Sequence, residues 1–249
     1  MQIIKAENLS KLFHIKTSGR FCALGQILDF LHFKNNSKKQ LWALKDVNFE
    51  INSGETVGLI GNNGAGKSTL LRIISDIYGP TSGKITVNGN AISVINFYFS
   101  LNSRLSMREN ILLSCSLYGL SSSNIKKQVD KVIEFAELEE FVNQPLYKLS
   151  NGMLQRLIFS IALYSINEAD VNILLLDEVL AVGDNNFINK SIKKLTEIFG
   201  SKLTIIMASH NLNDIISWCQ RTIWLDAGQL AMDGLTSEVL PAYKKTLKF

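Results

Sequence analysis

Nine consecutive residues in the first third of the chain have the composition of a phosphate-binding turn. They are Gly61, Asn62, Asn63, Gly64, Ala65, Gly66, Lys67, Ser68 and Thr69. Small residues let consecutive backbone N–H groups turn toward an anion, and a following helix adds partial positive charge at its N-terminus. In such a turn Lys67 reaches the β- and γ-phosphates of a nucleotide, and the Ser68 hydroxyl holds Mg²⁺. We therefore predict nucleotide binding.

Two elements must hold this P-loop in place. The mostly apolar run 55–60 before it predicts a buried strand, and residues 70–74 after it have helical spacing. The sequence of strand, glycine-rich turn and helix is the context that makes the motif specific.

A second group of chemically competent residues follows an apolar strand predicted over residues 171–176. This strand ends in Asp177 and Glu178. If the strand is buried next to the P-loop, Asp177 can bind Mg²⁺ directly or through water, and Glu178 can polarise an attacking water as general base. Two acids after a strand are weak evidence alone, and the P-loop upstream is what favours the functional interpretation.

Two further stretches have both a structural and a functional interpretation. Ser150 and Gly152 lie at the start of a predicted helix, where their N–H groups and the Ser150 hydroxyl form a second potential phosphate site or simply an N-cap. His210 follows the last apolar core strand, where it can point at the γ-phosphate, although a lone histidine there is usually structural.

The amino-acid composition indicates the class of protein and excludes several kinds of partner and site. The chain has 249 residues, 46% of them hydrophobic and 19% charged, which suits one large domain with a sizeable core. The net charge of +4 comes without a dense Lys/Arg block, so nucleic acid is not an expected partner. Three scattered cysteines indicate neither a disulfide framework nor a zinc site. No run of about 18 apolar residues exists, and the N-terminus is typical of a short strand and not of a signal peptide.

Along the chain, residues 2–7 and 45–51 predict strands, with an apparent insertion over about 14–40 between them. The middle of this insertion, residues 21–31, favours a short helix with an apolar face, and lysines follow it. Such a segment contacts a membrane surface or a partner, or else packs on its own domain, and the sequence favours neither. Helices predicted over about 107–118, 123–137 and 151–165 form a helical subdomain spanning about 97–165. Alternating strands and helices then continue to a closing helix at 236–246.

Taken together, the motifs resemble those of an ATP-binding cassette (ABC) ATPase, and the resemblance covers nearly the whole chain. They are the P-loop, the stretch Leu149-Ser150-Asn151-Gly152-Met153, the Asp177-Glu178 pair, the stretch Ala181-Val182-Gly183-Asp184, and His210. The resemblance implies a single α/β P-loop NTPase domain with a mostly parallel core sheet, an antiparallel β subdomain and a helical subdomain. It also implies ATP and Mg²⁺ as cofactors.

The resemblance further implies a dimer of two copies that holds two ATP molecules. Each ATP lies between the P-loop of one copy and the signature stretch of the other, here Leu149 to Met153, with Ser150 and Gly152 as its candidate ATP-binding residues. Glu178 then matches the catalytic base, His210 the switch histidine, and Asp184 the aspartate that faces the partner copy. The aromatic residue that stacks on adenine is Phe13 by its place after the first strand, with residues near Leu24-Gly25 as the alternative.

Details of these motifs look like the nucleotide-binding subunits of polysaccharide exporters. The relevant stretches are 42–47, Arg108-Glu109-Asn110, Asn151-Gly152-Met153 and 178–184. Two positions depart from the usual pattern: Asn151 replaces a glycine, and Asn96 stands where a glutamine or glutamate normally contacts Mg²⁺ or water. Because the chain stops at Phe249, we expect no carbohydrate-binding module of the kind that long C-terminal extensions form.

The resemblance thus predicts an ATPase subunit, peripheral at the cytoplasmic face of the inner (plasma) membrane. It would drive export of a lipid-linked polysaccharide such as O-antigen through a separate transmembrane permease. The alternatives are an ABC ATPase subunit for another cargo, or a soluble ABC protein that acts on no membrane.

Overall fold

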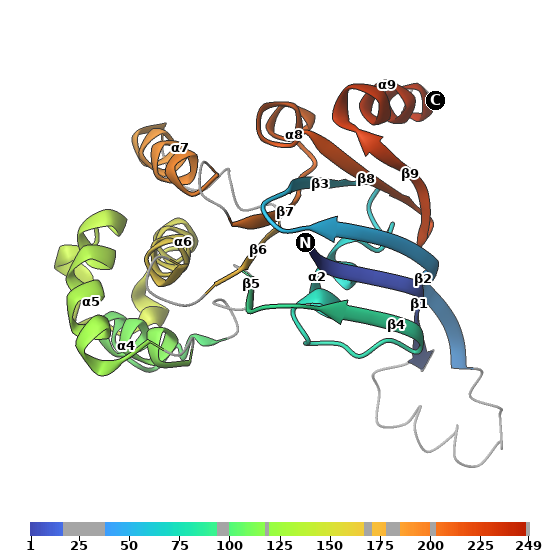
Figure 1. Cartoon of the computed structure of the whole chain (residues 1–249). Coiled ribbons are helices and arrows are strands. Elements are labelled where there is room, and N and C mark those ends of the chain that lie inside the picture. Colours follow the sequence, from blue (N-terminus) through green and yellow to red (C-terminus); the bar gives the residue numbers. More distant parts are fainter. Residues whose placement is uncertain are drawn as a thin grey trace, which may run out of the picture.

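A computed structural model of the chain describes residues 1–16, 38–93, 100–117, 120–166, 171–177, 185–199 and 203–247. Within these ranges no helix is long and apolar enough to cross a membrane. Figure 1 shows two sheets side by side, a group of helices beside them, and a further pair of helices on the central sheet.

The central sheet has six strands in the order β5-β6-β7-β3-β8-β9. Their bounds are β3 (Thr56–Ile60), β5 (Ala91–Ser93), β6 (Ile173–Asp177), β7 (Thr204–Ala208), β8 (Arg221–Asp226) and β9 (Gln229–Leu235). Neighbours from β5 to β8 are parallel, and β9 pairs antiparallel with β8. The predicted mostly parallel core sheet is confirmed.

The central strands separate two cores. In β6, Leu174 and Leu176 pack into one core, and Ile173 and Leu175 pack into the other. Successive side chains of a strand point to opposite faces, so a continuous apolar run indicates a sheet that is covered on both sides. This is why the strands beside the P-loop are almost entirely apolar.

The second sheet is antiparallel, with the order β2-β1-β4. It consists of β1 (Gln2–Lys16), β2 (Lys38–Asn52) and β4 (Ser82–Val87). The strands predicted at 2–7 and 45–51 are present but longer, because the β1–β2 ladder continues to the pair Lys16 and Lys38. Both ends of the predicted insertion 14–40 are therefore strand, and the helix predicted over 21–31 lies outside the described residues.

Helix α2 (Lys67–Ile74) lies between the two sheets and shares one core with both (Figure 1). It ends at Ile74, the last residue of the stretch with helical spacing. The N–H groups of Ile77 and Tyr78 both donate to the carbonyl of Arg72, at 2.9 and 3.1 Å, which closes the helix in a turn.

Helices on the other face of the central sheet make up the second core. The helical lobe, defined here as α4 (Met107–Leu117), α5 (Ser122–Ala136) and α6 (Asn151–Ile166), lies beside α7 (Asn185–Phe199) in Figure 1. Short 3₁₀ segments, η1 (Glu139–Phe141) and η2 (Leu146–Lys148), connect α5 to α6. Helices α8 (Leu212–Trp218) and α9 (Thr236–Thr246) pack above β3, β8 and β9.

Residues 108–110 have structural roles in the helical lobe. Ser106 and Glu109 form a capping box, because the Ser106 N–H donates to Glu109 Oε2 at 2.8 Å and the Glu109 N–H donates to Ser106 Oγ at 3.3 Å. Asn110 is fully buried, and its amide donates to the carbonyls of Asn102, Leu105 and Ser106 at 2.9–3.1 Å. The loop before α4 is thereby fixed from within.

Candidate nucleotide-binding site

The last glycine of the P-loop is packed against the antiparallel sheet. Gly66 has a φ of +104°, and a Cβ placed on it would lie 2.5 Å from the carbonyl oxygen of Ala43 and 2.8 Å from Leu44. A side chain therefore cannot fit there, and the positive φ adds strain for any other residue. The chain enters α2 at Lys67 immediately after this contact.

The first glycine is packed just as tightly, against the central sheet. A Cβ on Gly61 would lie 2.2 Å from the carbonyl oxygen of Leu225 in β8. Gly64 differs, because its φ is +81° but a Cβ there would meet nothing within 4 Å. The two ends of the loop are thus clamped by backbone, whereas its middle faces open space, where a phosphate would lie.

Lys67 is held inside the loop and is only 6% exposed. Its Nζ donates to the carbonyl of Gly61 at 2.7 Å and to that of Asn62 at 3.2 Å. These carbonyls fix the ammonium group at the position where a P-loop lysine meets the outer phosphates of a nucleotide.

The turn between β8 and β9 forms a hydrogen bond to the P-loop. The Gly228 N–H donates to the Ala65 carbonyl at 3.2 Å, and the Gly228 carbonyl accepts from the Lys45 N–H at 2.8 Å. One residue therefore links the P-loop to β2. The sequence shows Gly228 only as a break in the pattern and does not reveal this contact.

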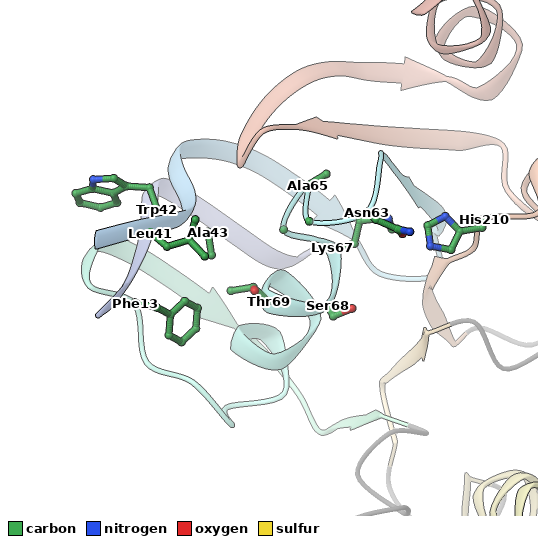
Figure 2. Close-up of a pocket in the computed structure, with 12 residues that line it drawn as sticks. Phe13, Leu41, Trp42, Ala43, Asn63, Ala65, Lys67, Ser68, Thr69 and His210 are labelled. Carbon is green, nitrogen blue, oxygen red and sulfur yellow. The ribbon is translucent and has the colours of Figure 1, made fainter. Parts of the chain in front are cut away.

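A pocket of about 270 Å³ opens over the loop. Its lining residues are Phe13, Leu41, Trp42, Ala43, Asn63, Gly64, Ala65, Gly66, Lys67, Ser68, Thr69 and His210. Figure 2 shows His210, Asn63 and Lys67 at one end, and Phe13, Leu41 and Trp42 at the other. The polar end suits phosphates and the apolar end suits a planar base, which is the division a nucleotide requires.

Phe13 lies in the wall of this pocket, as its predicted role requires. Its ring packs edge-on against Tyr78 at 5.6 Å, and Lys11 Nζ lies 5.3 Å from its centroid. Leu41 and Trp42 of β2 lie beside it because β1 and β2 pair Phe13 with Leu41 and Leu12 with Trp42. Sequence reasoning did not place residues 41 and 42 at the site, because the exposure of these two apolar side chains is visible only in the structure.

The carboxyl ends of three adjacent parallel strands lie at one edge of the central sheet, where the P-loop and His210 line the pocket and Asp177 does not. The P-loop follows β3, His210 follows β7, and Asp177 ends β6, with β7 between the other two strands. Asp177 is opposite Ala208 in the β6–β7 register. The topology thus brings Asp177 and His210 to the same sheet edge as the P-loop, as predicted.

A small polar network holds the residues on both sides of His210. Ser209 Oγ donates to Asp214 Oδ2 at 3.3 Å and accepts from the Asn211 N–H at 3.0 Å. Asn211 Nδ2 also donates to Asp214 Oδ1 at 3.0 Å. Because Asn211 caps α8, His210 is placed by the start of that helix.

Ser68 and Asp177 offer the oxygen donors that Mg²⁺ prefers, and both lie at this edge. These two residues would hold the ion, and bound Mg²⁺ would neutralise developing negative charge on the phosphates. Asn96, Glu178 and Asp184 lie outside the described residues, and their roles stay predictions. Within the described part of the chain no group of three or more His, Cys, Asp or Glu side chains forms a metal site.

Ser150 and Gly152 are not part of the pocket lining. They stand at the start of α6 in the helical lobe, where Ser150 Oγ accepts from the Met153 N–H at 3.2 Å. Ser150 therefore acts as the N-cap of this helix. A Cβ on Gly152 would meet nothing within 4 Å.

Comparison with known proteins identifies the family. Residues 44–181 match the ABC transporter family, which is more than half of the chain. The O-antigen export system ATP-binding protein RfbB of Klebsiella pneumoniae is 37% identical over 82% of this chain and 82% of its own length. The chain belongs to the ABC transporter family, as its motifs predicted.

Other relatives carry related names. The teichoic acids export ATP-binding protein TagH of Lactococcus lactis is 39% identical over 99% of this chain but only 51% of its own length. TagH of Staphylococcus epidermidis is 38% identical over 98% of this chain and 89% of its own. The chain spans about half to two thirds of the length of several of these relatives.

Solved structures support the fold. The dimeric ATP-binding cassette MJ0796, in a post-hydrolysis state with ADP and Pi, superposes with a TM-score of 0.72. The match covers 94% of this chain and 99% of that chain at 23% identity. This likeness confirms the predicted cassette fold.

Proposed function

We propose that this chain is the ATP-hydrolysing subunit of an ABC transporter that exports a lipid-linked polysaccharide such as O-antigen or teichoic acid. The observation that carries the nucleotide part is the clamped P-loop, with Lys67 held by two loop carbonyls at the floor of a pocket with one polar and one apolar end. The cargo follows from the names of the relatives, which are export proteins for these glycans.

In the proposed reaction the P-loop N–H groups and Lys67 bind the phosphates, and Ser68 and Asp177 hold Mg²⁺. Glu178 acts as the base that accepts a proton from the attacking water, and His210 contacts the γ-phosphate. Phe13 provides the aromatic contact to adenine from the apolar end of the pocket. Hydrolysis transfers the γ-phosphoryl group to water and leaves ADP and phosphate.

The working unit we propose is a dimer of two copies. Ser150 and Gly152 lie on the helical lobe, away from the chain's own pocket, and Gly152 has open space around it. The N-terminus of α6 would complete the site of the partner copy, with Asp184 facing the other subunit. ATP then favours the closed dimer because it contacts both copies only in that state.

A transmembrane permease is the second proposed partner. The described residues include no membrane-spanning helix, and we place the chain as a peripheral subunit at the cytoplasmic face of the plasma membrane. The loop 96–104, with the helix α4 after it, would carry closure of the dimer to the permease. Alanine substitutions at Phe97 and Tyr98 that left transport intact would contradict this route.

The first experiment compares purified wild-type protein with Glu178→Gln. Measurements are ATP hydrolysis and the molar mass in solution with and without ATP. We expect hydrolysis to be lost in the variant and an ATP-bound dimer to accumulate. A variant that hydrolyses ATP at the wild-type rate would contradict the role of Glu178.

The second experiment addresses the cargo. Affinity purification from membranes of a cell that makes the glycan should recover a polytopic membrane protein with the chain, and deletion should leave lipid-linked glycan inside the cell. Recovery of a permease without any glycan defect would favour another cargo. Recovery of no membrane protein would favour a soluble ABC protein.

A further inference from the structure

Helix α9 reaches the P-loop through the side chain of Tyr243. This residue is 6% exposed, and its hydroxyl donates to Oδ1 of Asn62 at 3.2 Å. Asn62 is the second residue of the loop and lies 181 positions before Tyr243 in the sequence. Neither the P-loop motif nor the family resemblance gives Tyr243 a role.

The ring of Tyr243 is fixed by the same strand that clamps the loop. It packs edge-on against Trp224 of β8, with the centroids 5.4 Å apart. The next residue, Leu225, presents the carbonyl that lies against Gly61. Burial, with a smaller effect of the nearby Asp226 charge, raises the pKa of Tyr243, so the phenol keeps its proton and stays a donor.

The backbone carbonyl of Asn62 accepts hydrogen bonds from two other residues of the loop. It accepts from Lys67 Nζ at 3.2 Å and from the Ala65 N–H at 3.0 Å. The same residue therefore organises the lysine and the backbone turn, while its side chain is held by Tyr243. A shift of Asn62 would move an acceptor of the ammonium group that meets the phosphates.

We propose that Tyr243 is a positioning residue for nucleotide binding, because its hydroxyl fixes Asn62 and thereby pre-organises the P-loop and Lys67. A loop that is already ordered loses less conformational entropy when the nucleotide binds. Removal of the hydroxyl weakens nucleotide affinity and leaves the chemical step unchanged. This inference rests on ATP binding, which is part of the proposed function, and not on the cargo or the permease.

The test is Tyr243→Phe in the full chain, which removes one oxygen and keeps the ring against Trp224. We expect the Kd of a fluorescent ATP analogue and the KM for ATP to rise about three- to tenfold, the loss of one hydrogen bond. The kcat should stay within about twofold of wild type. The matched control is Tyr147→Phe, a tyrosine of η2 that is 67% exposed, and it should change neither constant.

A double-mutant cycle separates this role from a general loss of packing. Asn62→Ala removes the acceptor, and in the double variant the two effects should not add, because each removes the same hydrogen bond. Additive effects, an unchanged Kd, or a fall in kcat at constant KM would each overturn the proposal. If wild type binds the analogue and Tyr243→Phe binds it equally well, nucleotide binding stands and this inference alone fails.

Discussion

The P-loop and the Ser150–Gly152 stretch differ in what surrounds their glycines. At the P-loop, Gly61 and Gly66 touch backbone carbonyls of β8 and β2 so closely that no side chain fits. At the start of α6, a methyl group added to Gly152 would have no neighbour within 4 Å. The P-loop is enclosed by other segments of its own chain, whereas the Ser150–Gly152 stretch has open space around Gly152.

The difference indicates how the two stretches work. The P-loop takes its shape from two sheets, so it is ready for a phosphate before any partner arrives. The Ser150–Gly152 stretch has its own helix cap, which fixes a direction for its N–H groups, and neither residue lines the pocket over the P-loop. In the dimer proposed above, the partner copy would supply the surface that faces this stretch. The predictions below run from the largest expected effect to the smallest, and those at Lys67, Gly66 and Gly152 test this contrast.

Lys67→Ala should reduce ATP hydrolysis by on the order of a hundredfold or more, because it removes the charge that stabilises the outer phosphates. The measurement is steady-state phosphate release at saturating ATP. Lys84→Ala, at an exposed lysine of β4, serves as the matched control and should hydrolyse ATP like wild type. Equal losses in both variants would show that Lys67 has no special place in the site.

Gly66→Ala should destabilise the fold by about 2–3 kcal/mol, because the new methyl meets the Ala43 carbonyl at a φ of +104°. Urea unfolding of the nucleotide-free protein gives this free energy directly. Gly79→Ala is a suitable comparison, because a Cβ there would meet nothing within 4 Å and no positive φ is involved. An undiminished stability of Gly66→Ala would mean that the loop is not clamped by β2.

The free energy of unfolding should depend on pH at alkaline values, because the Cys219 thiol is buried in the core around α8. Burial, with a smaller contribution from Asp214, raises the pKa of the Cys219 thiol from its ordinary 9.0 to about 12. Between these values the unfolded chain binds fewer protons than the folded one, so stability falls as the pH rises. At one unit above 9.0 this amounts to about 1.4 kcal/mol.

Unfolding of wild type and Cys219→Ala at several pH values measures this effect. Below about pH 8 the stability gap between them should be constant, and above about pH 9 it should narrow, because only wild type carries the ionising thiol. A gap that stays constant up to about pH 10 would show that the thiol is solvated.

Gly152→Ala should leave the stability of the isolated chain within about 0.5 kcal/mol, because the methyl meets no neighbour. ATP-dependent dimerisation should nevertheless weaken, since the methyl lies where the partner's phosphate is proposed to approach. Light scattering of the Glu178→Gln protein, with and without Gly152→Ala, measures the association. If the Glu178→Gln protein forms ATP-driven dimers equally well with and without Gly152→Ala, the Ser150–Gly152 stretch is not part of the dimer interface.

Much of the fold could be predicted because its signals are local. The apolar run before Gly61 and the closing helix over 236–246 follow from short-range patterns, and the structure places α9 at the predicted bounds. The P-loop itself is specified by residue types that only a phosphate cradle requires. Strand β9 was missed because its polar and glycine residues lack the apolar run of its neighbours.

The sequence by itself thus determined the cassette family, the phosphate-binding loop, and the acid and histidine at the sheet edge. Tertiary structure alone decided which residues surround the loop. Phe13 faces Leu41 only because bulges between β1 and β2 set that register, and Tyr243 meets Asn62 only because α9 folds back over β8. Local patterns encode elements, whereas contacts between residues far apart depend on how the sheets and helices pack.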